Sequence, residues 1–273
     1  MKDESRPDLS VVIVNWNTEA LLQACVQSLF LSPPPGALEV TVVDNASSDN
    51  SVASLRRSWP AVHLIENTQN VGFARANNQG IAVSRGRYIL LLNSDTLVPP
   101  NALRQLADFM DEHPEAGAVG PRLIRPDGCP QPFAFGGDPT PLYLLRRGLS
   151  LLLLRRPLHD WNTNLVQSVD WVSGACLWLR RQALEQAGPL DEAIFMYFED
   201  NDLCLRLRQC GWKIYYNPQV SIAHLGSQSL KQNLAAQKAY DASLKHFYRK
   251  HYGLPGQLWL RAGLPLYRLI VRY

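Results

Sequence analysis

The chain repeats one pattern: a short run of apolar, mostly β-branched residues, then polar residues, then helix-like periodicity. The first two runs, residues 9–14 and 39–43, end in Asn15 and Asp44, and residues 51–58 follow as an expected helix. Strands buried on both faces of a sheet have this apolar character, and strand–helix alternation is typical of parallel sheets with right-handed crossovers. The pattern predicts an α/β protein.

The third long run, residues 88–92, ends abruptly in Asn93-Ser94-Asp95. In open α/β sheets, ligands bind at the carboxyl edge of the strands. Asp95 is therefore predicted to be a carboxylate that a rigid strand presents to a ligand. The alternative is that Asn93, Ser94 and Asp95 only form a turn and cap the helix that follows Pro99-Pro100.

The rest of the chain continues in the same style. A further strand is expected at 62–65 before the central run, and others follow it at 118–120, 170–179, 212–217 and 220–223. Helices are expected over about 70–84, 101–113, 180–187 and 202–210. The first ~120 residues are typical of a nucleotide-binding α/β half.

Net charge, cysteine number and the length of the apolar runs argue against several classes of protein. A net charge of +3 over 273 residues is too small to indicate nucleic-acid binding, so no nucleic-acid partner is expected. The five cysteines form no CxxC pair, which argues against a zinc site, and their odd number suits a reducing compartment. The first eight residues lack the apolar core of a signal peptide, and no apolar run approaches the ~18 residues of a membrane span. We expect a cytoplasmic protein.

A second polar cluster follows the aromatic run Phe195–Phe198. It reads Glu199-Asp200-Asn201-Asp202 and opens an expected helix. Carboxylates are favoured at helix N-termini, so capping explains Asp200 or Asp202. Capping needs only one such residue, and three acids therefore indicate a further role for at least one. The aromatic residues could stack on a sugar ring.

Two stretches combine basic and apolar residues. Residues 142–156 place two arginine pairs around a leucine cluster, and residues 243–273 contain no Asp or Glu. Either stretch could lie on an anionic membrane surface, at the inner face of the cell membrane. The alternatives are a partly mobile lid packed on the body for residues 142–156 and a solvated helix packed on the domain for the tail.

Taken in order, these stretches resemble the inverting family 2 glycosyltransferases with the GT-A fold, in particular the bacterial rhamnosyltransferases of polysaccharide assembly. The match covers roughly residues 9–230, but no motif covers residues 121–168 or the tail. The matching motifs are Val14–Asn17, Val43–Ser47, Asn70–Gly80, Asn93–Asp95, Gly174, Glu199–Asp202 and His224.

The resemblance implies a Rossmann-like, mostly parallel central sheet flanked by helices, a smaller acceptor-side subregion and a helical C-terminal tail. It implies one glycosyltransferase domain over residues 1–242, with a nucleotide-sugar-binding half at 9–120. The acceptor-side half would be 121–242, including the 121–168 insertion, and 243–273 would be the basic and apolar tail.

The resemblance also assigns roles around the donor. Asp44 would hydrogen-bond the pyrimidine base, and Asn15 and Asn17 would line the same pocket. Gly72 and Asn77 would belong to the loop against the nucleoside.

A divalent cation, Mg²⁺ or Mn²⁺, would bind the diphosphate through Asp95, with His224 completing its shell. Asp200 would be the general base, with Glu199 beside it. This chain departs from the family pattern at Asn93, where a metal-binding carboxylate is expected. Asn93 can offer a carbonyl oxygen or bond the ribose.

The reaction implied is inverting transfer of a sugar from a dTDP- or UDP-linked donor, with dTDP-rhamnose among the candidates. The acceptor would be a hydroxyl group of a glycan or lipid-linked molecule in cell-surface polysaccharide synthesis. Two alternatives are a sugar nucleotidyltransferase and a catalytically silent nucleotide-sugar-binding module. The first would be expected to carry a glycine-rich triphosphate loop, which Asn15-Trp16-Asn17 is not, and the Glu199–Asp200 pair argues against the second.

Overall fold

The computed structural model describes residues 7–31, 33–34, 36–226 and 234–270. Its strands are β1 (Leu9–Asn15), β2 (Leu38–Asp44), β3 (His63–Glu66), β4 (Tyr88–Asn93), β5 (Thr96–Leu97), β6 (Ala116–Ile124), β7 (Phe135–Gly136), β8 (Gln167–Ser168), β9 (Trp171–Val172), β10 (Cys176–Arg180) and β11 (Lys213–His224). Its helices are α1 (Glu19–Leu31), α2 (Ser51–Ser58), α3 (Phe73–Val83), α4 (Ala102–Glu112), α5 (Pro141–Leu149), the π-helical turn η1 (Ser150–Leu154), α6 (Arg181–Ala187), α7 (Glu199–Gln209) and α9 (Leu234–Ile270).

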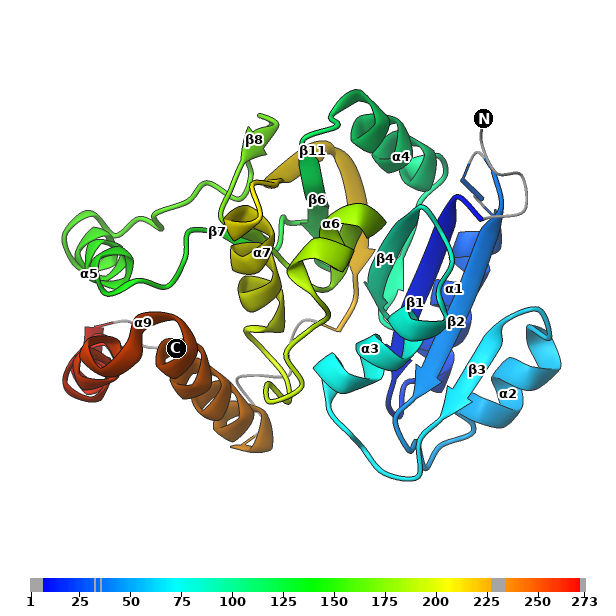
Figure 1. The fold of residues 1–273 in the computed structure, drawn as a ribbon, viewed down its shortest axis with the longest axis horizontal. Helices are drawn as coiled ribbons and strands as arrows, with labels where there is room; N and C mark the ends of the chain where they lie inside the picture. The colour runs from blue at the N-terminus through cyan, green and yellow to red at the C-terminus, as the bar shows by residue number, and fades with distance from the viewer. Residues whose placement is uncertain (1–6, 32, 35, 227–233, 271–273) are drawn as a thin grey trace.

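One mixed sheet runs through the middle of the molecule (Figure 1). Within the described residues its order is β3-β2-β1-β4-β10-β6-β11-β5, with β8 paired to β11, and β7 pairs separately with β9. Helices pack against this sheet, while α5 and α9 lie at the end of the molecule away from β1, β2 and β3 (Figure 1). The predicted α/β class, with helices flanking a mostly parallel sheet, is confirmed.

The N-terminal half is parallel, as its sequence pattern predicts. β1 lies between β2 and β4, and all three strands have almost wholly buried apolar side chains. In register, Asn15 stands opposite Asp44, and Val14 stands opposite Asn93. Because parallel strands end at the same edge, the polar residues that end these three strands meet there.

The C-terminal half departs from that pattern. β10 runs antiparallel between β4 and β6, and β11 is parallel to β6. The two strands expected at 212–217 and 220–223 are wrong, because they form the single strand β11. Its register is irregular between Asn217 and Ser221, around Pro218, whose missing N–H interrupts a ladder.

Residues 170–179, expected as one strand, are also divided. The chain turns at Gly174 and Ala175, so β9 ends before the turn and β10 begins after it. This turn lies beside the end of β4, because the backbone N–H of Asn93 donates to the carbonyl oxygen of Ala175 at 3.0 Å.

A second apolar cluster joins the C-terminal helix to the body. Its buried members are Leu144, Phe198, Leu244, Phe247, Tyr248 and Leu260. They come from α5, from the residue before α7 and from α9, which bends at Gly253. The packing alternatives for residues 142–156 and for the tail are therefore confirmed on one side of each segment. In the part of the chain that the structure describes, no helix combines the length and apolar character needed to cross a bilayer.

Asp202 anchors α9 to α7, so its interpretation as a helix cap is wrong. The N-cap residue of α7 is Phe198, and no side chain caps this helix. The fully buried Asp202 carboxylate lies 2.7 Å from Lys250 Nζ and from His251 Nε2, and 2.8 Å from Arg206 Nε. Burial opposes its ionisation, but the hydrogen bonds and charges of these partners outweigh burial and lower the pKa of Asp202 to about 2.

Asp202→Asn should destabilise the fold by about 2–3 kcal/mol while the shape is kept. Arg206 and Lys250 lose a buried counter-charge, although Asp191 still faces Lys250, and His251 loses a charged hydrogen-bond partner. Urea unfolding at pH 7 measures this difference. Asp108→Asn is the matched control. The Asp108 carboxylate is 54% exposed and lies 3.7 Å from Arg104, so its loss should cost less than about 0.5 kcal/mol.

The effect of Asp202→Asn should depend on pH in one direction. The folded-state pKa lies below the ordinary value of 3.8, so the charge stabilises the fold above 3.8. That contribution is lost as pH falls through this value toward about 2. Equal stability of the two proteins at pH 7 would contradict the anchoring role.

Candidate active site

The polar strand ends form a braced cluster at the carboxyl edge of the sheet. Asn15 Nδ2 donates to Asp44 Oδ1 at 2.8 Å. Ser47 donates to the same carboxylate twice, from its backbone N–H at 2.9 Å and from its hydroxyl group at 2.6 Å. Asp44 and Asn15 are both buried, so these bonds hold the carboxylate in one orientation. The structure brings these two predicted residues together.

Asn17 connects the loops that follow β1 and β2. Its Oδ1 accepts from the backbone N–H of Ser48 at 2.7 Å. Its backbone has a φ of 55°, in the left-handed region that asparagine tolerates better than most residues. Trp16, beside it, is exposed at the same edge.

Gly72 brings the start of α3 against the loop before α7. Its φ is 89°, and a Cβ at this position would lie 2.7 Å from the ring of Phe195. Its carbonyl oxygen accepts from Asn45 Nδ2 at 3.3 Å. Asn77 is different, because it is buried inside α3 and its Nδ2 donates to the carbonyl oxygen of Phe73. The structure does not bring Asn77 to the open edge.

Asp95 and His224 are far apart in the sequence but lie side by side in the structure. β11 pairs with β5, so His224 stands beside Thr96, and Asp95 Oδ1 lies 3.1 Å from His224 Nε2. Asn93 Nδ2 lies 3.3 Å from the same nitrogen. Asn93 Oδ1 and Asp95 Oδ1 are buried and make no hydrogen bond within the described residues.

Gln131 is a site residue that the sequence did not reveal. Its Oε1 lies 2.6 Å from His224 Nδ1, so it accepts the Nδ1 proton. This bond favours the imidazole tautomer whose Nε2 carries a lone pair facing Asn93 and Asp95. Gln131 lies in an irregular loop 93 residues from His224, and no motif or periodicity marks it.

These groups fit a divalent cation. The Asp95 carboxylate and the Asn93 amide both lie within 3.3 Å of His224 Nε2, and each has a buried oxygen without a hydrogen bond in the described chain. Carboxylate, amide oxygen and imidazole are ligands that Mg²⁺ and Mn²⁺ accept. Among the described residues no group of three or more His, Cys, Asp and Glu side chains could hold a metal. The protein therefore offers a partial set, open on one side.

The acid pair lies across the Gly174 turn. The backbone N–H of Gly174 donates to Asp200 Oδ2 at 2.8 Å, and that of Asn201 donates to Asp200 Oδ1 at 2.8 Å. Glu199 is buried, and its Oε2 has no hydrogen bond within the described chain. A Cβ on Gly174 would lie 3.6 Å from Asp200 Cβ and 3.7 Å from Glu199 Oε1, so the turn lies directly against both acids.

Glu199 and Asp200 have different surroundings, which affect their pKa values differently. Burial raises the pKa of Glu199, and the neighbouring charge of Asp200 raises it further. Burial also raises the pKa of Asp200, but the N–H groups of Gly174 and Asn201 stabilise its charged form. When one proton is shared by such a pair, Glu199 retains it and Asp200 is the ionised carboxylate.

The turn before α7 is strained. Tyr197 and Phe198 both have a φ of 69°, which L-residues with large side chains rarely adopt. Such strain costs about 1–3 kcal/mol per residue and clusters at functional sites. Phe198 is buried beside Phe247 and Tyr240 of α9, so it cannot stack on a sugar as the aromatic run suggested, whereas Phe195 is exposed.

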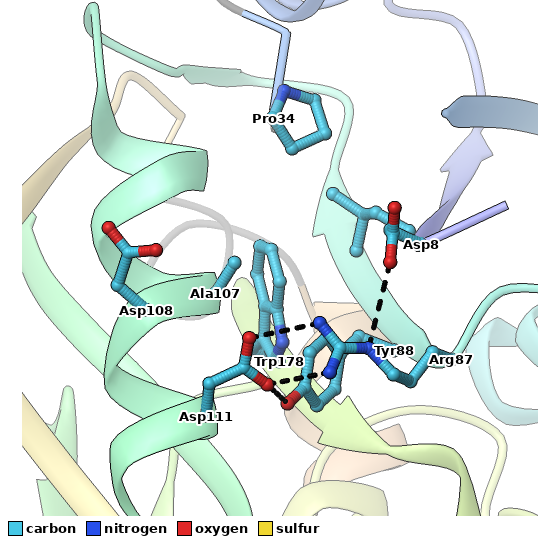
Figure 2. A pocket seen from close by; sticks show the side chains of 9 residues that line it. Asp8, Pro34, Arg87, Tyr88, Ala107, Asp108, Asp111 and Trp178 are labelled. Carbon is cyan, nitrogen blue, oxygen red and sulfur yellow. Dashed lines mark hydrogen bonds and ion pairs between the residues drawn. The ribbon is translucent and has the colours of Figure 1, made fainter. Parts of the chain in front are cut away.

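A separate cavity of about 170 Å³ lies at the opposite edge of the sheet, where β1 and β4 begin (Figure 2). Trp178 lines it, and Arg87 and the Tyr88 hydroxyl group contact Asp111 at 2.7 Å and 2.6 Å. The predicted site residues do not line this cavity.

Solved structures with a similar fold are glycosyltransferases. GalNAc-T7 with UDP, GalNAc and Mn²⁺ matches with a TM-score of 0.64 and 16% identity, over 95% of this chain and 55% of that one, so the chain spans about half of its length. The mannosyltransferase PcManGT from Pyrobaculum calidifontis, in complex with GDP-Man and Mn²⁺, matches with a TM-score of 0.55 and 18% identity, over 97% and 83%. At these identities the likeness shows the GT-A fold alone.

Curated relatives match over much of the chain. An N-acetylglucosaminyl-diphospho-decaprenol L-rhamnosyltransferase of Mycobacterium tuberculosis is 31% identical over 94% of this chain and 87% of its own. The low-salt glycan biosynthesis hexosyltransferase Agl10 of Haloferax volcanii is 30% identical over 74% of this chain and 62% of its own.

The model of the family described as Glycosyl transferase family 2 matches residues 10–186, more than half of the chain. The matched region contains the braced Asp44, the Asp95 strand end and the Gly174 turn. This protein therefore belongs to glycosyl transferase family 2.

Proposed function

We propose that this glycosyltransferase moves a sugar, with inversion, from a dTDP- or UDP-linked donor to a hydroxyl group of a lipid-linked glycan. One observation carries this assignment. Gly174 donates to the Asp200 carboxylate while Ala175, the next residue, accepts from Asn93. Two adjacent residues thus join a carboxylate that can take a proton to the strand end that faces the donor diphosphate.

The donor would lie over residues 9–120 and the acceptor over residues 121–242. On the donor side, the oriented Asp44 carboxylate would accept the imide N–H of a pyrimidine base, with Asn15 and Asn17 beside it. Gly72 would belong to the loop against the nucleoside, and its missing side chain lets Phe195 pack against that loop. dTDP-rhamnose is the first donor to test, because a relative is an L-rhamnosyltransferase that acts on a diphospho-decaprenol acceptor.

Asp95, His224 and the Asn93 carbonyl oxygen would hold Mg²⁺ or Mn²⁺, with further ligands from the donor diphosphate. When bound, such a cation acts as a Lewis acid toward the departing phosphate. Gln131 keeps the His224 Nε2 lone pair directed at this position. The solved structures of similar fold contain Mn²⁺ by their titles, which supports the choice of ion.

The transfer itself needs one base. Asp200 would take the proton from the acceptor hydroxyl group as that oxygen attacks the anomeric carbon from the face opposite the leaving diphosphate. The nucleotide carries the leaving charge away, and a single displacement inverts the anomeric centre. Glu199 would remain protonated and neutral, so no second negative charge would lie beside Asp200. The cytoplasmic location expected from the sequence stays a prediction.

Asp200→Asn should lower kcat by roughly 10²–10⁴-fold, because the amide keeps the shape and can accept one of the two backbone N–H groups but cannot take a proton. The Kd for the donor should stay within a factor of about two, since the base faces the acceptor. Turnover with a matched donor and acceptor, alongside calorimetry of the donor nucleotide, measures both. Glu199→Gln is the matched control and should retain more activity, because a neutral amide resembles the protonated acid. If Asp200→Asn turned over normally while Glu199→Gln was inactive, the two roles would be exchanged.

Asp44→Ala should weaken UDP and dTDP by a similar factor of about 10–100, because each loses a hydrogen bond to a charged group. Isothermal calorimetry with both nucleotides measures this change. ADP serves as the probe for general damage, since a purine lacks the imide N–H. Ser47→Ala, which removes one brace but keeps the carboxylate, should have a smaller effect. Unchanged UDP affinity in Asp44→Ala would remove Asp44 from the base pocket.

Gln131→Leu should weaken Mn²⁺ binding by about 10–100-fold, because the His224 imidazole loses the partner that fixes its tautomer. Electron paramagnetic resonance titration of Mn²⁺ in the presence of UDP gives this affinity without turnover. Gln131→Glu, which still accepts the Nδ1 proton, should restore binding. Gln219→Leu is the control, because Gln219 is exposed on the same strand as His224. Equal Mn²⁺ affinity in wild type and Gln131→Leu would contradict the positioning role.

A further inference from the structure

Helix α5 carries two apolar stripes, and only one of them is covered. Leu144 packs into the second apolar cluster with Phe198 and Leu260, and Leu151 of η1 packs against the same cluster. The other stripe faces outward. We call it the leucine face, and its members are Leu142, Leu145, Leu149, Leu152, Leu153 and Leu154. A helix with apolar residues on both sides normally has a partner on each.

The leucine face is strongly exposed. Its side chains are 43–71% accessible, and three of them, Leu152–Leu154, are consecutive. Helix α9 contacts α5, and its Leu254 and Leu258 are exposed as well. Contiguous exposed apolar side chains of this kind mark a binding surface rather than ordinary scatter.

The basic residues near the leucine face indicate a partner with negative charge. Residues 139–159 and 243–273 together hold 10 of the 27 Lys and Arg residues and none of the 24 Asp and Glu residues. The rest of the chain keeps 17 basic residues against 24 acidic ones, a net charge of −7. On α5 and η1, Arg146, Arg155 and Arg156 are exposed beside the leucines. Exposed positive charge therefore lies directly beside the leucine face.

The position of the face relative to the acid pair is fixed by packing. Leu144 and Phe198 belong to one cluster, and Phe198 directly precedes Glu199 and Asp200. Figure 1 shows α5 and α9 together at one end of the molecule, next to α7. A surface bound to α5 therefore lies on the same side of the molecule as the strained turn that presents the base.

We propose that the leucine face inserts into the surface of an anionic lipid bilayer, with Arg146, Arg155 and Arg156 on lipid phosphates. This inference rests on the proposed function, because a lipid-linked acceptor would then reach Asp200 from the membrane to which the enzyme is attached. Exposed leucines enter the acyl boundary, and arginines pair with anionic headgroups. A second copy of the chain fits less well, since two such faces would oppose their arginines.

Co-sedimentation of the full chain with vesicles tests the proposal. Wild type should bind phosphatidylcholine vesicles containing 30% phosphatidylglycerol, bind pure phosphatidylcholine weakly, and detach as salt rises. Leu152→Ser/Leu153→Ser/Leu154→Ser should reduce the partition coefficient on the order of 100-fold. Arg155→Gln/Arg156→Gln should reduce it about fivefold for each arginine, only on the anionic vesicles.

The matched control replaces three exposed apolar residues elsewhere: Leu31→Ser/Val83→Ser/Leu165→Ser. It should bind vesicles like wild type. All variants should keep the wild-type Tm, because the side chains that they change are exposed. They should also keep the wild-type UDP affinity, because no residue changed lies in the base pocket or the acid pair. Loss of UDP binding in wild type would instead count against the proposed function.

Three results would overturn the membrane proposal. One is equal partition of wild type and the triple leucine variant. Another is equal binding to neutral and anionic vesicles. The third is a concentration-dependent dimer in sedimentation velocity that the triple leucine variant abolishes, since a second copy would then cover the face.

Discussion

The site depends on one short turn, which lies between β9 and β10. β10 pairs with β4, and the turn that precedes β10 places Gly174 under the acid pair and Ala175 beside Asn93. Gly174 lies against both acids, at a distance where a Cβ would make ordinary van der Waals contact with them. Parallel strand ends alone would supply a nucleotide site. In the proposed mechanism, the inserted antiparallel strand adds a proton acceptor to it.

The surroundings of Glu199 and Asp200 favour different protonation states. Both carboxyl groups are pushed toward the neutral form, but Asp200 receives two backbone N–H bonds and Glu199 Oε2 receives none within the described residues. Tyr197 and Phe198 have a strained, left-handed backbone just before the two acids. The packing of Phe198 against α9 keeps this backbone in place. Asp202 also fixes α9 to α7, so α9 contributes to the geometry of the proposed base.

Local patterns predicted the parts that local physics determines. The strands ending in Asn15, Asp44 and Asn93 follow from short apolar runs, and their meeting at one edge follows from parallel pairing. The approach of Asp95 to His224 was expected from the resemblance alone. Three features could not be predicted, because tertiary packing sets them: the contact of Gln131 with His224, the ion pairs of Asp202, and the continuation of β11 through Pro218. The local sequence pattern contains no sign of them. Asp202 was interpreted as a cap because its charge lies in the first turn of a helix.

The most direct test of the account is the stereochemistry of the reaction. A single displacement, with Asp200 as base and no protein nucleophile, requires inversion at the anomeric carbon. Proton nuclear magnetic resonance of the newly formed glycosidic bond, or of the first free sugar released when water replaces the acceptor, reports the configuration relative to the donor. The account predicts inversion of the donor configuration in the first product formed. Retention would require a covalent or front-face route and would contradict it.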